Sequence, residues 1–563
     1  MRCILFSLVF ALRADVSVSA YSNVLVIVID DLRPWFGAYN ATWMKTPHVD
    51  KLAANGTVFT RAYANQAVCG PSRISFLTGR RPDTTQLYDF GSYWREVSGN
   101  FSTLPEYFRT VGGFHTRSVG KVFHPIGAMK RSKHADDVPY SWSSMPYHPD
   151  TQQFKNAPVC NNTDTDPSIE DDGKLHANIV CPVDDDLSSQ PGHTLPDDDS
   201  AAEAARLLRD ELGHAGQNFL LMVGFHKPHI PLKFPRRFLD LYPPGRNDSV
   251  PLPAAAARMK PDGMPPVAWD SFDDVRSRDD VAALNFSWPY GPVSTRYTRL
   301  VRRAYAAAIS YVDAQVGVVL NALEDARLSE STAVVLFGDH SWQLGERGEF
   351  AKYSVAEVAT RVPLIVRLPQ STSSGSRNSG AANQSTTTVP YSDALVELVD
   401  LFPSLAELAG LPPPPLCSMA HSSMTSTCVE GSSWAAHTRS NTTVLRKAAA
   451  FSQYPRPADV PRGPSEGNTD LPSLVNITRM GYSMHTNDDL RYTEWVSFRG
   501  NYSASGAIIT SGPEWKSVHA RELYNLSTDP LELNNLVADS RYAALVASLS
   551  ARLQAGWRNA LPK

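Results

Sequence analysis

A cysteine at the start of a predicted helix is the residue whose chemistry stands out first. Cys69 lies two residues before Pro71, which suits the first turn of a helix because its missing N–H costs nothing there. Gly79 suits the far end, where a left-handed residue stops a helix. Arg73 is still in the first turn, so its guanidinium can reach back toward the unpaired N–H groups at the positive end of the helix dipole. The stretch predicts a nest for an anion with a sulfur atom beside it.

Charged and histidine side chains follow several apolar runs that read as buried strands. Asp30 and Asp31 follow the run at 24–29, and Asp339 and His340 follow the run at 333–337. Two adjacent carboxylates repel each other and favour a hard cation such as Ca²⁺ or Mg²⁺, the structural alternative being a solvated turn or a helix cap. Ligands of open α/β sheets bind at the carboxyl ends of the strands, so we expect side chains to converge there. They are Asp30, Asp31, Cys69, Arg73, Lys121, His124, His226, Asp339, His340 and Lys352.

Cationic and metal-binding residues around an anion-ready helix start suit a tetrahedral anion, that is, a sulfate or phosphate ester. The aromatic stretch at 88–95 follows the Cys69 helix and either lines a sugar pocket or packs structurally. The loop at 225–229 carries two histidines and a lysine, which favours a site over a structural role.

The elements that must position these residues alternate along the chain. Buried-strand patterns occur at 24–29, 116–119, 219–224, 333–337 and 363–368, and helical patterns at 200–212, 297–327 and 393–411. This alternation predicts an α/β catalytic domain with a parallel sheet over 21–445. Strand-like pieces at 480–484 and 492–498 and a terminal helix at 541–557 predict a smaller α+β domain over 446–563.

The composition describes a globular protein of more than one domain. The chain has 563 residues, of which 42% are hydrophobic and 20% charged. The net charge of −4 gives no reason to expect nucleic acid or a membrane surface as the main partner. Outside residues 1–20 we expect no stretch that is long and apolar enough for a membrane helix, and hence no stable membrane insertion.

Several features predict entry into the secretory pathway. Residues 1–20 resemble a cleaved signal peptide, and the stretch at 370–388 resembles a flexible surface insertion. Two pairs of nearby cysteines are plausible local disulfides, Cys160 with Cys181 and Cys417 with Cys428. Cys69 is then left over as a reactive thiol or a modified residue. Glycosylation sequons begin at Asn40, Asn55, Asn100, Asn161, Asn247, Asn285, Asn383, Asn441, Asn476, Asn501 and Asn525.

The phrase from Cys69 to Gly79, Cys-x-Pro-Ser-Arg-x-x-x-Leu-Thr-Gly, resembles the signature of the type I sulfatases. The phrase at 522–530 resembles one found near the end of these enzymes. The resemblance implies an alkaline-phosphatase-like α/β fold, with a large mixed, mostly parallel sheet flanked by helices and a smaller C-terminal α+β domain. It implies that a formylglycine-generating enzyme converts Cys69 to formylglycine, whose aldehyde hydrate is the nucleophile that attacks sulfur.

The resemblance also implies a role for each candidate residue. Arg73, Lys121 and His124 would assist the nucleophile, with His124 taking a proton after the attack, and His226 and Lys352 would contact the sulfate and the leaving group. The family usually has Gly at the position of Ser341, where a serine would be strained if the backbone needs a positive φ. One Ca²⁺ ion would be bound by Asp30, Asp31, Cys69, Asp339 and His340.

Within the family, the phrases at 68–73, 79–85, 88–90, 223–229, 351–354 and 451–457 are most similar to the branch that removes the 2-O-sulfate of L-iduronate from heparan sulfate and dermatan sulfate in lysosomes. The alternatives are a sulfatase of another sulfated sugar, a phosphate or phosphonate ester hydrolase of the same superfold, and an inactive secreted glycan-binding homologue. The predicted location is lysosomal or secreted.

Overall fold

The computed structural model describes residues 21–90, 92–124, 135–161, 172–214, 216–244, 249–254, 258–369, 391–418, 427–438, 446–461, 470–502 and 508–562. The predicted signal peptide at 1–20, the predicted insertion at 370–388 and the sequon asparagines Asn247, Asn383 and Asn441 lie outside the described residues.

A seven-stranded mixed sheet forms the centre of the protein, in the order β11-β2-β10-β7-β1-β5-β3. All neighbouring strands are parallel except β10, which runs antiparallel to both β2 and β7. The strands are β1 (Asn23–Ile29), β2 (Thr57–Tyr63), β3 (His115–Gly120), β5 (Phe219–Phe225), β7 (Thr332–Gly338), β10 (Arg361–Arg367) and β11 (Tyr391–Glu397).

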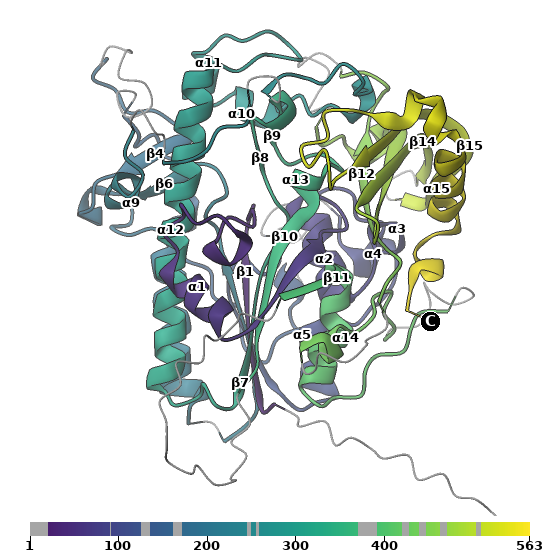
Figure 1. Ribbon diagram of the computed structural model, residues 1–563. Helices are drawn as coiled ribbons and strands as arrows, with labels where there is room; N and C mark the ends of the chain where they lie inside the picture. The colour runs from purple at the N-terminus through teal and green to yellow at the C-terminus, as the bar shows by residue number, and fades with distance from the viewer. Residues whose placement is uncertain are drawn as a thin grey trace, which may run out of the picture.

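The uninterrupted apolar run of β1 is explained by burial on both faces. Leu25, Ile27 and Ile29 pack in one hydrophobic cluster, with the long helix α12 (Thr295–Asp325). Val24 and Val26 pack in a second cluster, with α2 (Cys69–Thr78) and α14 (Leu401–Leu408). Helices therefore cover both faces of the sheet, with α1 and α12 on one side and α2, α5 and α14 on the other (Figure 1).

The described helices range from single turns to the 31 residues of α12. Besides α2, α12 and α14, they are α1 (Pro47–Ala54), α3 (Pro82–Thr85), α4 (Trp94–Val97), α5 (Leu104–Thr110), α8 (Pro196–Arg206), α9 (Arg237–Asp240), α10 (Asp273–Arg276), α11 (Asp279–Ala282), α13 (Glu357–Thr360) and α15 (Ala543–Ala555).

Two predicted helices have different bounds in the structure. The helix predicted at 200–212 begins at Pro196, where proline and three aspartates suit the first turn, and it continues as a π-helical segment, Leu207–Leu212. The helix predicted at 393–411 is wrong in its first part, because 391–397 is the edge strand β11, parallel to β2. Pairing with β2 outweighed the local helical pattern, and the helix α14 begins only at Leu401.

A four-stranded antiparallel sheet, in the order β12-β13-β14-β15, lies toward the C-terminus and carries α15 (Figure 1). Its strands are β12 (Ala449–Arg456), β13 (Arg479–Thr486), β14 (Leu490–Tyr502) and β15 (Ile508–Asn525). The Gln453 backbone N–H of β12 donates to the Asn65 carbonyl at 2.8 Å, so this sheet docks next to the segment that leads into α2.

Both predicted disulfides are present, Cys160–Cys181 and Cys417–Cys428, and Cys69 is the free cysteine among the described residues. The expectation about membrane helices was wrong by length and composition, because α12 is long and apolar enough to cross a membrane. However, 78% of its most apolar window is buried inside the protein, as in the core helix of a globular domain.

Candidate active site

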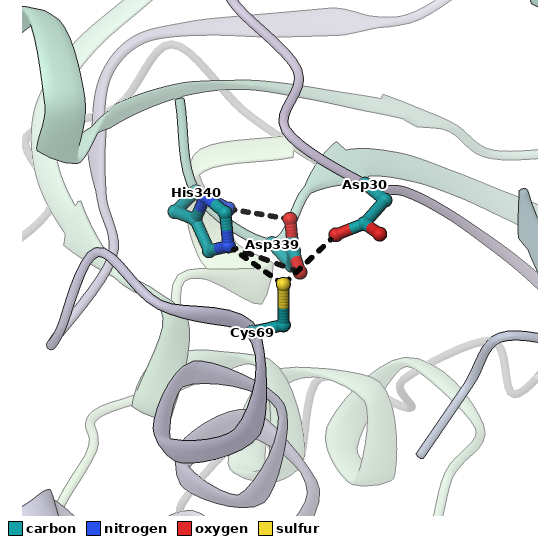
Figure 2. Close-up of side chains that lie close together, drawn as sticks. All are labelled: Asp30, Cys69, Asp339 and His340. Atoms are coloured by element: carbon teal, nitrogen blue, oxygen red, sulfur yellow. Dashed lines mark hydrogen bonds and ion pairs between the residues drawn. The ribbon is translucent and has the colours of Figure 1, made fainter. Parts of the chain in front are cut away.

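Four side chains converge on the sulfur of Cys69 at the carboxyl edge of the central sheet. The Sγ atom lies 3.3 Å from Asp30 Oδ1 and 3.3 Å from His340 Nε2 (Figure 2). Lys352 Nζ lies 3.2 Å from the same sulfur and Lys121 Nζ lies 3.7 Å from it. The predicted nest for an anion at residue 69 is thus surrounded by acidic and basic groups from four separate segments.

The geometry of α2 confirms the helix predicted around Cys69. The helix begins at Cys69 and is capped by Gly79 in the left-handed region, with φ 65°. Arg73 in the first turn is fully buried, and its Nη2 lies 3.3 Å from Asp30 Oδ1 and 3.0 Å from Asp339 Oδ2. Asp30 and Asp339 meet because β1 and β7 are parallel neighbours, with Ile29 opposite Gly338.

Asp31 lies at the centre of a second set of contacts. Its Oδ1 accepts from Lys352 Nζ at 2.8 Å and lies 3.4 Å from His340 Nδ1. Its Oδ2 lies 4.0 Å from His229 Nε2. The Asp31 backbone has φ 58°, and its carbonyl accepts from the Tyr305 hydroxyl on α12, so the long helix fixes the turn that follows β1.

Burial raises the pKa of two of the three acids of this site, although cations contact all three. Burial and the neighbouring Asp30 raise the pKa of Asp339 to about 8. Burial, only partly offset by Lys352, raises the pKa of Asp31 to about 6. Asp30 is the exception, because Lys121, His229 and Arg73 outweigh its burial and hold its pKa well below the ordinary value. Asp31 Oδ2 and Asp339 Oδ2 accept no hydrogen bond among the described residues.

These groups fit a bound cation. One ligand atom from each of Asp30, Cys69, Asp339 and His340 lies within 4.8 Å of the others, and Asp31, Cys69 and His229 form a second such group. Three of the six residues in these groups are aspartates, and their carboxylate oxygens suit a hard cation. A cation would also satisfy the two orphaned carboxylate oxygens and relieve the repulsion that raises the pKa values of Asp31 and Asp339.

Cys69 is a poor nucleophile as a thiol in this setting. Its side chain is completely buried, and burial together with the charge of Asp30 raises the thiol pKa to about 12. The thiolate is the reactive form of cysteine, so the surroundings suppress the ordinary chemistry of the residue. This favours the modified residue over the reactive thiol, the two possibilities that the cysteine count left open.

The remaining predicted residues line a pocket of about 240 Å³ beside this cluster. Lys121, His124, His226 and Lys352 all line it. The ring of His226 is oriented by Asp197, whose Oδ1 lies 3.2 Å from Nδ1. All ten residues that the sequence predicted to converge therefore lie at one edge of the sheet, in the Cys69 cluster or along this pocket.

The aromatic stretch at 88–95 turns out to be divided between packing and the pocket. Tyr88, Tyr93 and Trp94 are buried in the core. Phe90 alone among them lines the pocket, where its ring stacks on His124 with centroids 4.3 Å apart. Burial and the nearby Lys121 lower the pKa of His124 well below its ordinary value, which keeps the imidazole neutral.

Three residues of the site had no predicted role. His229 lies in the histidine-rich loop that the sequence singled out, so its position carried a signal. Asp197 lies in the first turn of α8, before the predicted helix start at residue 200, so the sequence analysis gave it no role. Asp274 lines the pocket and accepts from the Tyr353 hydroxyl at 2.7 Å. It comes from an irregular stretch of the sequence that offered no signal.

Ser341 is not strained. It does not lie in the left-handed region, and its backbone N–H donates to the Ala359 carbonyl at 2.9 Å. A serine therefore fits this position of the backbone without the penalty that a positive φ would impose.

The fold and the site together define a hydrolase for esters of a tetrahedral anion. The family description "Sulfatase" matches residues 22–411. The chain is 45% identical to iduronate 2-sulfatase of Mus musculus, covering 94% of this chain and 93% of that one, and 44% identical to iduronate 2-sulfatase of Homo sapiens, covering 92% of each. The phosphonate monoester hydrolase of Agrobacterium radiobacter has the same fold, with a TM-score of 0.63, 20% identity and 96% of both chains covered.

This protein belongs to the sulfatase family and is a sulfuric ester hydrolase. The comparisons confirm the resemblance read from the Cys69 phrase and the predicted α/β class with a large, mostly parallel sheet and a smaller C-terminal sheet. Sulfatases use a metal ion and a formylglycine residue, and the buried acidic group around Cys69 is where this chain could hold the ion.

Proposed function

We propose that this protein removes the 2-O-sulfate of L-iduronate from the glycosaminoglycans heparan sulfate and dermatan sulfate. The observation that carries the proposal is the likeness to two iduronate 2-sulfatases, at 44–45% identity along at least 92% of the chain. The cationic pocket beside Cys69 supports it, because a sulfated sugar is an anion and the pocket is lined by several lysines and histidines.

Residue 69 is the proposed nucleophile, after a formylglycine-generating enzyme has converted its side chain. Formylglycine would supply a hydrated aldehyde, which offers one hydroxyl to attack sulfur and a second to expel the sulfate afterwards. The suppressed thiol chemistry of Cys69 and its lack of a disulfide partner support this conversion.

We assign one Ca²⁺ ion to Asp30, Asp31, Asp339 and His340, together with residue 69. A bound divalent cation would draw charge from the sulfate oxygens. The hard oxygen donors and the orphaned carboxylate oxygens support a cation of this kind.

The chain's own residues would orient the ester and move protons. Arg73 and Lys121 contact Asp30 and hold the nucleophile end of the site in a fixed arrangement. Lys352 stays charged, because Asp31 and the other acids outweigh its burial and raise its pKa well above the ordinary value. Lys352 or His226 would stabilise the departing sugar oxygen, for which water alone is a poor acid. Neutral His124 would take the proton from the remaining hydroxyl of residue 69.

The proposals on processing, domain limits and location come from the sequence. We propose that residues 1–20 are a cleaved signal peptide, that 21–445 form the catalytic domain, and that 446–563 form the C-terminal α+β domain. The mature protein would be a glycoprotein of the lysosome or the extracellular space. The sequon residues Asn40, Asn55, Asn100, Asn285 and Asn476 are exposed, which supports glycosylation.

The decisive experiment measures sulfate release from defined disaccharides. Protein purified from a secretory host should release sulfate from 2-sulfated iduronate faster than from 2-sulfated glucuronate or 6-sulfated glucosamine. Peptide mass spectrometry should find residue 69 as formylglycine. Preference for one of the other sugars, or faster turnover of an aryl phosphate than of an aryl sulfate, would contradict the proposal. An unmodified thiol in active protein would exclude the nucleophile.

The metal is tested separately by chelation. Removal of Ca²⁺ with EGTA should abolish sulfate release and lower the melting temperature, because three buried carboxylates lose their counter-charge. Adding back Ca²⁺ should restore both. An enzyme that keeps its full activity and melting temperature after exhaustive chelation would rule out a metal at Asp30, Asp31 and Asp339.

A further inference from the structure

Three cationic side chains lie along the pocket beside the groups already described. Lys155, Lys233 and Arg278 line the same pocket as Lys121 and Lys352, and each comes from a different segment of the chain. Within the described ranges none of the three forms an ion pair with a carboxylate. Unpaired cations grouped at a pocket wall are the usual signature of a site for an anion.

The acids that line the pocket bind groups other than these three cations. Asp197 accepts the backbone N–H groups of His226 at 2.7 Å and Lys227 at 2.8 Å, and Asp274 accepts the Tyr353 hydroxyl. These are the carboxylates among the described lining residues. Arg278 also repels Lys233: burial and the charge of Arg278 lower the pKa of Lys233 to about 8. The pocket wall formed by Lys155, Lys233 and Arg278 therefore favours a bound anion, because no described carboxylate pairs with these cations.

Lys227 lines the same pocket but differs from these three cations in its hydrogen bonds. Its ammonium donates to the Pro231 carbonyl at 2.6 Å and to the carbonyl of His229, so its hydrogen bonds are made within its own loop. The other cations keep donors free. Among the described residues, the Lys233 ammonium has one long hydrogen bond, to the Phe154 carbonyl at 3.3 Å, and the Arg278 guanidinium bonds to the Asn156 side chain alone, through two nitrogens at 3.2 Å each.

A disulfide, a strand pair and an aspartate connect the three segments that carry Lys155, Lys233 and Arg278. The disulfide Cys160–Cys181 ties the loop that carries Lys155 to β4 (Val180–Val183). This strand pairs with β6 (Leu232–Pro235), with Cys181 opposite Lys233. Asp280, two residues after Arg278, accepts the backbone N–H groups of Ile179 at 2.9 Å and Val180 at 3.2 Å. Three otherwise independent pieces of chain are therefore held in register around the cations.

We propose that Lys155, Lys233 and Arg278 form a second anion subsite, which binds a negative charge of the substrate other than the sulfate being removed. This inference rests on the proposed function, since a sulfated uronate carries such a charge in its own carboxylate and its neighbour can carry one in a further sulfate. The subsite makes the enzyme selective for polyanionic sugars over simple sulfate esters. Lys155, Lys233 and Arg278 are specificity residues, and they take no part in the chemical step.

The test compares selectivity between the wild type and a double variant, Lys155→Gln with Arg278→Gln. The readout is the ratio of kcat/KM for methylumbelliferyl iduronide 2-sulfate to kcat/KM for methylumbelliferyl sulfate, which has no second charge. The ratio should fall about tenfold or more, mainly through a higher KM for the iduronide, because charge-assisted hydrogen bonds are lost. The charge-conserving variant, Lys155→Arg with Arg278→Lys, should retain most of the ratio.

Two controls separate selectivity from folding. Arg237→Gln removes an exposed cation that follows β6 and contacts Asp185 outside the pocket, and it should leave the ratio unchanged. Melting temperatures are measured for every variant. If the double variant does not fold, Lys233→Gln alone provides a second reading of the same wall and should lower the ratio in the same direction.

A further comparison identifies the source of the anion. A fall already seen with the monosaccharide iduronide assigns the subsite to the uronate carboxylate. A fall seen only with disaccharides that carry an N-sulfated glucosamine, and not with N-acetylated ones, assigns it to the neighbouring sulfate. Equal ratios for wild type and variants on all substrates would overturn the subsite. A wild type that cleaves the aryl sulfate but no 2-sulfated iduronide would instead overturn the proposed function.

Discussion

Two buried clusters of charged side chains meet at the turn after β1, and they differ in how the charge of their acids is compensated. In the first, Glu346 accepts from Arg33 Nη1 at 2.9 Å, from Arg302 Nη1 at 2.6 Å and from the Leu344 backbone N–H at 2.8 Å. Both of its oxygens are satisfied. Although burial opposes ionisation, the two guanidinium groups hold the pKa of Glu346 well below its ordinary value.

The second cluster, Asp30, Asp31 and Asp339, is equally buried but incompletely compensated. Two of its oxygens lack hydrogen bonds, and the pKa values of Asp31 and Asp339 are raised to about 6 and about 8. The two clusters touch through the Tyr305 hydroxyl, which accepts from the Arg33 backbone N–H at 3.0 Å and donates to the Asp31 carbonyl. The difference teaches that equally buried carboxylates can be compensated to different degrees, and the raised pKa values of Asp31 and Asp339 fit a place for a further cation.

Removing the proposed nucleophile should have the largest effect on activity and leave the Glu346 cluster unchanged. Cys69→Ala is expected to lower kcat by about 10⁴-fold or more, because no other group can take the place of the nucleophile. The melting temperature should fall less than it does on chelation, since Asp30, Asp31, Asp339 and His340 still offer ligands to the cation. Sulfate release and thermal unfolding measure the two effects, and residual turnover within tenfold of wild type would exclude residue 69 from the chemistry.

Neutralising one acid in each cluster should give opposite outcomes. Glu346→Gln leaves two buried guanidinium groups without their carboxylate, and we expect a loss of about 3–5 kcal/mol in the free energy of unfolding. Asp339→Asn should lower activity about 100-fold or more through a weakened metal site. In the metal-free protein it should cost less stability than Glu346→Gln, because relief of the repulsion from Asp30 offsets the weakened contact with Arg73.

For both variants, urea unfolding in EGTA measures the stability of the metal-free protein, and sulfate release per folded molecule measures the activity. The comparison between the clusters fails if Asp339→Asn destabilises the metal-free protein as much as Glu346→Gln does.

The acid in the pocket, Asp274, should give a smaller effect that depends on pH. Burial and the nearby Asp470 raise its pKa to about 7, so it is neutral below that pH and negatively charged above it. A negative charge at this position repels a sulfated substrate, so kcat/KM should fall as pH rises through about 7. Asp274→Asn should remove this fall while leaving the acidic side of the profile in place.

The same variant also predicts a change in stability. An acid with a raised pKa binds more protons in the folded state, so it costs stability as pH rises from its ordinary value of 3.8 toward about 7. Asp274→Asn should therefore flatten the decline of the melting temperature over this range. A basic limb and a melting curve identical to those of the wild type would show that Asp274 does not titrate there.

Ser341→Gly should have the smallest effect. The serine backbone is unstrained, so restoring the residue usual in the family is expected to change kcat/KM by less than about twofold and to lower stability by about 0.5–1 kcal/mol through unfolded-state entropy. A large gain of activity in Ser341→Gly would mean that the serine side chain, which is buried next to His340, disturbs the site.

Much of the fold was predictable because local rules and tertiary structure agreed. The apolar run of β1, the proline and glycine at the two ends of α2 and the two cysteine pairs each carry their structure in a few adjacent residues. The edge strand β11 was mispredicted because pairing with β2, a residue range more than 300 positions away, decided its conformation. The start of α8 was placed late for a different reason: its first turn is polar, and only its later residues are apolar and periodic.

The sequence by itself determined which residues carry the chemistry, because a nucleophile, its anion nest and paired acids leave a pattern in residue type and spacing. Only the tertiary structure decided how charge is shared among them. Whether a buried carboxylate has a lowered pKa, like Glu346, or a raised one, like Asp339, depends on which side chains from distant segments reach it. The wall of Lys155, Lys233 and Arg278 is the same case, since a disulfide, a strand pair and an aspartate bring its members together from three separate parts of the chain.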